Sequence, residues 1–205
     1  MALVRSDIKR LLQYKLCLLR FKELGVSTVY SHNLGEAAGI TAVQVRKDFS
    51  AYEIKGKKRG GYNIDELLEA LNVIFGSDRK NIIIVGMGNI GKALSQYNER
   101  FIKKNMHIVA GFDIDPAKQN KSYGIPIYPF EKLKEVIDYH KVSTAIIAVP
   151  FQTAQEVCNL LIAAGIKGIL NFAPVILKVP EEVVIDNINL SNKLEGIIYN
   201  IEKTR

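Results

Sequence analysis

The feature that most constrains the fold of this chain is a glycine-rich loop that begins only at residue 86. It directly follows the apolar run 82–85 and precedes a stretch with helical periodicity. A strand, a GxGxxG loop and a helix in this order form a dinucleotide-binding unit, because the glycines permit a tight turn and the helix N-terminus faces a pyrophosphate. The residues expected to contact a cofactor here are Gly86, Met87, Gly88, Asn89, Ile90 and Gly91.

From residue 81 onward, short β-branched runs alternate with helical stretches. This alternation predicts an α/β domain over residues 81–189, built as a Rossmann-like, doubly wound parallel sheet with helices on both faces. Strands are expected at 82–85, 108–112, 144–149 and 169–171, and helices at 90–103, 130–140 and 153–164.

An acidic residue stands where a dinucleotide fold needs one. Asp113 ends the next predicted strand, 22 residues after Gly91, and a carboxylate there can accept hydrogen bonds from the adenine ribose. Ile114, Asp115 and Pro116 follow, with no adjacent Arg or Lys to hold a 2′-phosphate. The sequence therefore favours NAD(H) over NADP(H). A CoA-binding or other nucleotide-binding module, or a nucleotide fold that binds nothing, is the alternative.

The positive charge of the chain is concentrated before the glycine loop. The whole chain carries a net charge of +7, of which residues 1–80 contribute +5, from 14 Lys and Arg against 9 Asp and Glu. An excess of this kind suits a polyanionic partner.

The first 80 residues contain a helix-turn-helix pattern, with helices expected at 6–24, 34–38 and 42–52. Thr41 and Gln44 form a capping-box pattern at the start of the third helix. Its outward face could read bases with amide and cationic groups, although a solvated amphipathic helix would show the same pattern. The residues expected to face DNA are Gln44, Arg46, Lys47 and Ser50.

A basic, glycine-rich segment follows this helix at residues 55–62. With residues 52–54 and 62–64 beside it, the segment predicts a β-hairpin that extends a winged helix, an α+β domain over residues 1–80. The tip would place Lys57, Lys58 and Arg59 on DNA, and a solvated loop is the alternative. Asp65 is expected to cap a helix that continues to Phe75.

Several functional classes are disfavoured by composition. No apolar stretch reaches the length of a membrane span, and no secretory leader is evident, so a cytoplasmic protein is expected. The two cysteines and three histidines lack metal-ligand spacing. The glycine loop has no adjacent Cys–His pair or other proton relay, so catalysis is not expected. An NAD-dependent oxidoreductase with a small helical appendage is the alternative.

Five segments together resemble the Rex family, which are redox-sensing transcriptional repressors of bacteria. They lie in order along the chain at residues 44–48, 86–94, 112–115, 148–150 and 163–174. The resemblance implies a homodimer that binds an operator of pseudo-two-fold symmetry and releases it when NADH occupies the nucleotide site. It also implies contacts near the nicotinamide from Tyr97 and from Asn171 and Phe172. Ala148, Val149 and Pro150 are further residues expected to bind the cofactor.

The amphipathic tail 190–205 is expected to form a helix. It could pack on its own domain, or it could exchange with a second protomer as a domain-swapped helix, which the resemblance implies. The chain differs from the family pattern at three places. Leu16 stands where an arginine is usual, Asn189 where an aspartate is usual, and residues 52–55 lack the usual Phe-Gly of the wing.

Overall fold

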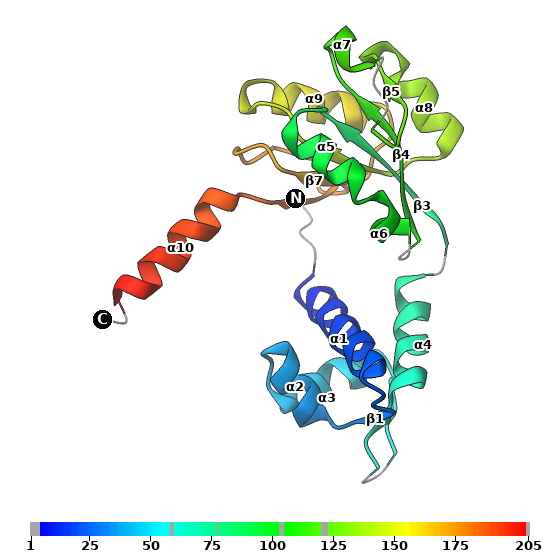
Figure 1. Cartoon of the computed structure of the whole chain (residues 1–205), viewed down its shortest axis with the longest axis vertical. Coiled ribbons are helices and arrows are strands. Elements are labelled where there is room, and N and C mark those ends of the chain that lie inside the picture. The colour runs from blue at the N-terminus through cyan, green and yellow to red at the C-terminus, as the bar shows by residue number, and fades with distance from the viewer. Residues whose placement is uncertain (1–4, 58–59, 77, 103–104, 120–122, 204–205) are drawn as a thin grey trace. The chain divides into compact units, whose positions relative to one another are not determined.

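The computed structural model describes residues 5–57, 60–76, 78–102, 105–119 and 123–203. The chain divides into two compact units, Val4–Ser77 and Asp78–Arg205. Figure 1 shows a helical first unit and a second unit built on a β-sheet. In the part of the chain described, no helix is both long and apolar enough to cross a membrane.

The first unit packs four helices and a two-stranded sheet around one apolar core. Leu11, Leu18, Val45, Phe49 and Leu71 are among its fully buried side chains. The elements are α1 (Ser6–Glu23), β1 (Thr28–Val29), α2 (Ser31–Ala38), α3 (Ala42–Ala51), β2 (Tyr62–Asn63) and α4 (Ile64–Phe75). The predicted order of helices and the winged-helix fold class are confirmed.

The predicted pairing of residues 52–54 with 62–64 is wrong, because β2 pairs antiparallel with β1. Residues 52–54 instead end α3. Glu53 has φ 57°, and the N–H groups of Glu53 and Ile54 donate to the carbonyls of Ser50 and Phe49. This is a Schellman motif, usually made by glycine at the left-handed position, so Glu53 gave no sequence signal for it. The turn that follows closes where the Lys57 N–H donates to the Gly61 carbonyl over 2.8 Å.

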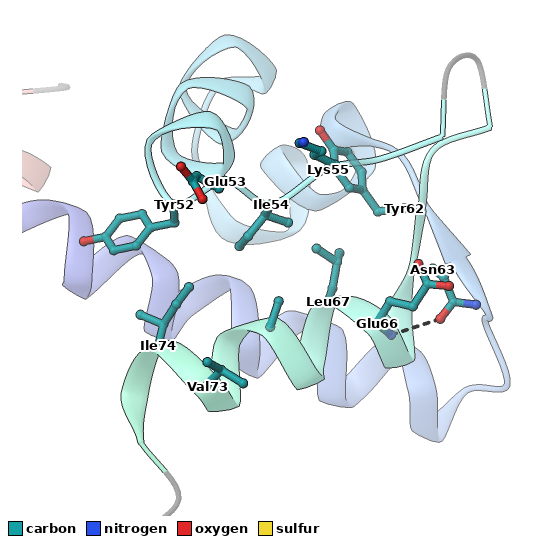
Figure 2. Close-up of a pocket in the computed structure, with 11 residues that line it drawn as sticks. Tyr52, Glu53, Ile54, Lys55, Tyr62, Asn63, Glu66, Leu67, Val73 and Ile74 are labelled. Carbon is teal, nitrogen blue, oxygen red and sulfur yellow. Dashed lines mark hydrogen bonds between the residues drawn. The ribbon is translucent and has the colours of Figure 1, made fainter.

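Asn63, not the predicted Asp65, caps α4. Its Oδ1 accepts hydrogen bonds from the N–H groups of Asp65 (2.9 Å) and Glu66 (3.1 Å), and the second of these is drawn in Figure 2. Asp65 instead lies in the first turn, where its charge is favourable to the helix dipole.

The second unit is a six-stranded parallel sheet in the order β5-β4-β3-β6-β7-β8. Strand β3 lies in the centre, β4 and β5 extend the sheet to one edge, and β6, β7 and β8 extend it to the other edge. The two halves therefore diverge between β3 and β6, which is the switch point of a doubly wound fold. The strands are β3 (Lys80–Val85), β4 (Met106–Phe112), β5 (Ile127–Tyr128), β6 (Thr144–Ile147), β7 (Gly168–Asn171) and β8 (Val184–Asn187).

Both faces of this sheet are buried, as the apolar run at 82–85 predicts. Ile83 and Val85 pack in one core cluster, and Ile82 and Ile84 pack in the cluster on the opposite face. Figure 1 shows helices on either side of the strands. The helices are α5 (Asn89–Gln96), α6 (Asn98–Ile102), α7 (Pro116–Gln119), the short 3₁₀ turn η1 (Phe130–Lys132), α8 (Leu133–His140), α9 (Phe151–Ala163) and α10 (Leu190–Lys203).

One predicted helix of this unit is divided into two, and two strands were not predicted. The helix expected at 90–103 ends at Gln96, and α6 follows after Tyr97. The break is fixed by Asn98, whose side-chain amide bonds to both the N–H and the carbonyl of Ile108 (3.0 and 3.1 Å). Strands β5 and β8 are short, and β8 contains polar residues, so neither carries a clear apolar pattern.

Substitution of the α4 cap tests the role of Asn63. Asn63→Ala should lower the free energy of unfolding by about 1 kcal/mol, because two N–H groups of the first turn lose their acceptor. Asn63→Asp keeps the acceptor and should stay close to the wild type. Urea denaturation followed by circular dichroism measures the difference. Equal stability of the alanine and aspartate variants would contradict this role.

Candidate functional site

The loops after β3, β4, β6 and β7 all emerge at the carboxyl-terminal edge of the sheet, because these four strands are parallel and adjacent. Ligands of open α/β sheets bind at this edge, beside the switch point. The structure therefore brings together most of the residues predicted to bind a cofactor: Gly86–Gly91, Asp113, Ile114, Asp115, Ala148, Val149, Pro150, Asn171 and Phe172.

Two glycines of the loop are required by close backbone contacts. Gly86 has φ +95°, and a Cβ placed there would lie 2.5 Å from the carbonyl oxygen of Ala148. A Cβ on Gly91 would lie 2.0 Å from the carbonyl oxygen of Gly86. Gly88 differs, since a Cβ there would meet no protein atom within 4 Å. The loop is therefore closely packed at Gly86 and Gly91 and open at Gly88, where the N-terminal N–H groups of α5 could bind an anion.

Asp113 connects the ends of β3 and β4. Its carboxylate is 7 % exposed and accepts hydrogen bonds from the N–H groups of Met87 (2.8 Å) and Asp115 (2.9 Å) and from Lys118 Nζ (2.9 Å). Burial alone would raise the pKa of this carboxyl, but these donors outweigh burial, and the pKa lies below its usual value. Asp113 is therefore ionised and holds the glycine loop in place.

Lys118 is a site residue that was not predicted from the sequence. No cation is adjacent to Asp113 along the chain, but α7 turns back, and the Lys118 ammonium reaches the Asp113 carboxylate. A cation therefore lies at this end of the strand although none is adjacent to Asp113 in the sequence. The signal was present, since Pro116 starts a short helix whose third residue is Lys118.

Asn171 is fully buried, with no exposed surface. Its amide nitrogen donates to the carbonyls of Ala173 (3.2 Å) and Val175 (2.8 Å) and to Asn187 Oδ1 (2.9 Å). Its Oδ1 accepts the N–H of Ala173 over 2.9 Å. This side chain shapes the loop after β7 and bonds it to the end of β8.

Tyr97 lies apart from this edge. It follows the last residue of α5, and its neighbour Asn98 is bonded to Ile108, near the beginning of β4. The Tyr97 ring is about half exposed and lies 5.3 Å from the guanidinium carbon of Arg100. A contact between Tyr97 and the nicotinamide stays a prediction.

In the first unit, α3 has a polar and cationic face. Arg46, Lys47 and Ser50 are exposed, as predicted, and Arg46 Nη1 donates to Ser31 Oγ over 3.0 Å. Val43 lies on the same face and is 54 % exposed, although its apolar side chain did not indicate an exposed position in the sequence. Lys57 is exposed near the turn, and Lys58 and Arg59 lie outside the described residues.

Gln44 is half-buried and makes only part of the predicted capping box. Its backbone N–H donates to Thr41 Oγ1 over 3.2 Å, as predicted. Its side chain does not return to Thr41. Instead, Gln44 Nε2 donates to Asp48 Oδ1 over 2.8 Å, one helical turn further on.

Asp48 is the centre of a buried polar cluster between α1 and α3. Arg10 binds its carboxylate with two groups, Nε to Oδ2 over 2.7 Å and Nη2 to Oδ1 over 2.6 Å. The Tyr14 hydroxyl donates to Oδ2 over 2.9 Å. Hydrogen bonding to Arg10 lowers the pKa of Asp48, and burial raises the pKa of Tyr14. The carboxylate is thus ionised, and the tyrosine is a neutral donor.

A separate groove of about 310 Å³ lies between the end of α3 and α4 (Figure 2). It contains none of the predicted cofactor residues. Its lining includes apolar side chains of α4 and the turn at residues 52–55, namely Tyr52, Ile54, Leu67, Ala70, Val73 and Ile74.

The two positions that differ from the family pattern have local surroundings of their own. Leu16 is 63 % exposed on α1, where Leu12 and Leu19 are also exposed one turn away. Asn189 precedes α10, and its Oδ1 accepts the N–H of Asn192 over 3.1 Å. No side chain of α10 is buried among the residues described. The described part of the chain also contains no cluster of His, Cys, Asp and Glu that could hold a metal ion.

The fold and the site define a class: a winged helix followed by a dinucleotide-type domain. Two family models match these parts, "Putative DNA-binding protein N-terminus" over residues 5–50 and "CoA binding domain" over residues 77–175. The redox-sensing transcriptional repressor Rex of Oenococcus oeni is 37% identical, over 97% of this chain and 92% of that protein. The chain belongs to the Rex family.

Solved structures of the Rex-family repressor RSP are similar throughout. RSP in complex with NAD+ and operator DNA has a TM-score of 0.90 and 32% identity, covering 100% of this chain and 95% of that one. RSP in complex with NADH has a TM-score of 0.86 and 33% identity, covering 98% and 95%. The winged-helix and Rossmann-like parts of the predicted fold class are therefore confirmed, and the domain swap of the C-terminal helix stays a prediction.

A matched pair of glycine variants tests the loop geometry. Gly91→Ala should destabilise the second unit by about 2 kcal/mol, because its Cβ would overlap the Gly86 carbonyl. Gly88→Ala should fold normally and bind NADH about tenfold more weakly, because its Cβ would occupy the open space beside the N-terminus of α5. Thermal denaturation and NADH fluorescence titration separate the two effects. Normal stability of Gly91→Ala would contradict the contact.

Proposed function

We propose that this chain is an NAD(H)-responsive transcriptional repressor, which binds operator DNA and releases it when NADH is bound. The observation that carries the proposal is the pairing, within one chain, of a dinucleotide-type sheet edge with a cationic helix-turn-helix face. The similarity to RSP over both units supports it, since RSP was solved with each nucleotide and with DNA. On this proposal the nucleotide is sensed and is not consumed by a reaction.

The cofactor is NAD(H), bound across the carboxyl-terminal edge of the sheet. The N-terminus of α5 and the open position at Gly88 suit the pyrophosphate. Asp113 suits the adenine ribose, and the largely exposed Ile114 provides an apolar surface beside it. The nicotinamide would extend toward Ala148–Pro150 and the loop that Asn171 shapes, beside Phe172. Residues 81–189 would form the domain that binds it.

The DNA partner would be bound by residues 1–80. Gln44, Arg46 and Lys47 of α3 would enter the major groove, because amide and cationic groups match the edges of adenine and guanine. Ser50 and the wing residues Lys57, Lys58 and Arg59 would contact the phosphate backbone. A repressor of this kind would act in the bacterial cytoplasm.

A homodimer completes the proposal. The apolar side chains along α10 are exposed to between 54% and 63%, and a second protomer would cover them. An exchange of the C-terminal segment 190–205, which contains α10, between protomers as a swapped helix would account for this exposed face. A two-fold dimer then requires an operator of pseudo-two-fold symmetry.

Two other functions remain to be tested against this one. The match of residues 77–175 to a CoA-binding model favours CoA as an alternative ligand, because CoA also carries an adenosine and a pyrophosphate. An NAD-dependent oxidoreductase would require a substrate and a proton relay. Titration with CoA, and an assay of NADH oxidation with candidate substrates, separate these functions from sensing.

Operator binding tests the central proposal. We expect the chain to select a palindromic operator from random DNA, and fluorescence anisotropy should show that NADH weakens this binding by about tenfold or more while NAD+ does not. Lys47→Ala should weaken operator binding by about tenfold, through loss of a groove contact. Lys134→Ala removes an exposed lysine of α8 and is the matched control.

Two results would count against the proposal. Equal effects of NADH and NAD+ on operator affinity would exclude redox sensing, but they would not contradict the proposal that the chain binds DNA. Absence of any operator preference would exclude the repressor function itself.

Asp113 and Lys118 together make a prediction about cofactor choice. NAD+ should bind about tenfold or more tightly than NADP+, because the Asp113 carboxylate repels a 2′-phosphate. Asp113→Asn should narrow this preference, because it removes the charge and frees Lys118 to pair with the phosphate. Calorimetric titration of both nucleotides measures the ratio. An unchanged ratio in Asp113→Asn would contradict the assigned role.

A further inference from the structure

The buried cluster at Asp48 restrains Gln44, one of the α3 side chains proposed to contact DNA bases. Its four hydrogen bonds come from Arg10, Tyr14 and Gln44. A carboxylate has about four lone-pair sites, so the acceptor capacity of Asp48 is filled. The group is also 4 % exposed, which leaves little room for water to replace any donor.

The geometry of the two helices keeps this carboxylate in one place. Arg10 and Tyr14 are one turn apart on α1, and Gln44 and Asp48 are one turn apart on α3. Arg10 grips both carboxylate oxygens, a bidentate arrangement that fixes orientation as well as distance. The Gln44 backbone is held separately by Thr41. The side chain of Gln44 therefore meets a stationary acceptor.

The hydrogen bond between Gln44 and Asp48 determines the orientation of the Gln44 side-chain amide. An ionised carboxylate can only accept, so the amide must turn its NH₂ group toward Asp48. One N–H is used there, while the second N–H and Oε1 remain available. The major-groove edge of adenine offers an acceptor at N7 and a donor at N6, which matches these two groups. A glutamine without such an anchor would lose rotamer freedom on binding, which costs affinity.

We propose that Asp48 is a positioning residue for sequence readout, which holds the amide of Gln44 in the orientation that recognises adenine. Asp48 itself does not touch DNA. This inference rests on the proposed function, because it assumes that α3 enters the major groove of an operator. It assigns to the Arg10–Asp48 pair a role in base discrimination in addition to joining α1 to α3.

The test replaces each adenine of a selected half-site, one at a time, by 7-deazaadenine, which lacks the N7 acceptor. At one position the wild-type affinity should fall by about tenfold, and Gln44→Ala should be insensitive to that replacement. Asp48→Ala should bind the normal operator and show a penalty of about threefold or less at the same position. Affinities are measured by anisotropy at fixed salt.

Tyr14→Phe is the matched control. It removes a hydrogen bond to Oδ2 of the same carboxylate and leaves the bond from Gln44 to Oδ1 intact. It should therefore keep the full penalty for 7-deazaadenine. Asp48→Ala leaves Arg10 without its partner, so a double variant, Arg10→Met with Asp48→Leu, removes the anchor without a stranded charge and should show the same reduced penalty.

Three results would overturn the inference. The first is an undiminished penalty in the Asp48 variants, with all operators weakened equally, since a purely structural role predicts this. The second is the absence of any position at which Gln44→Ala abolishes the penalty. The third is a Gln44 side-chain amide that NMR relaxation shows to be mobile in the free wild-type protein. Failure of the wild type to bind any operator would instead refute the proposed function.

Discussion

A carboxylate in a protein interior must be surrounded by donors, because an unpaired buried charge is very costly. This constraint organises both units of the chain. Among the described residues, the buried polar side chains are Asp48, Ser95, Asp113 and Asn171. Each has a hydrogen-bond partner, and none leaves a buried side-chain nitrogen or oxygen unsatisfied. Asp48 joins α1 to α3, Asp113 joins the ends of β3 and β4, and Asn171 bonds β7 to β8.

These contacts show where sequence reasoning succeeded. The glycine loop, Asp113 and the central strands were predicted because their signals are local: a motif, a spacing and an apolar run. The partners of the buried groups could not be predicted in the same way. Lys118 reaches Asp113 only because α7 turns back, and Arg10 meets Asp48 from 38 residues away. Asp48 itself did leave a signal, since it lies between Val45 and Phe49 on the buried face of α3.

Leu16 and Asn189 are two positions where this chain has a neutral residue and the family pattern has a charged one. Each has a local role that needs no charge. Leu16 lies with Leu12 and Leu19 on α1, and Asn189 caps α10.

In the proposed homodimer, the exposed apolar face of α10 would link folding to the concentration of the protein. When a second copy buries that surface, association becomes part of folding, and the midpoint of thermal unfolding rises with protomer concentration. In the proposed dimer, the fraction of chains able to bind an operator would therefore increase with the expression level. At low abundance, dissociation would remove both the paired DNA readers and the cover over α10, so the chain would lose operator binding and stability together.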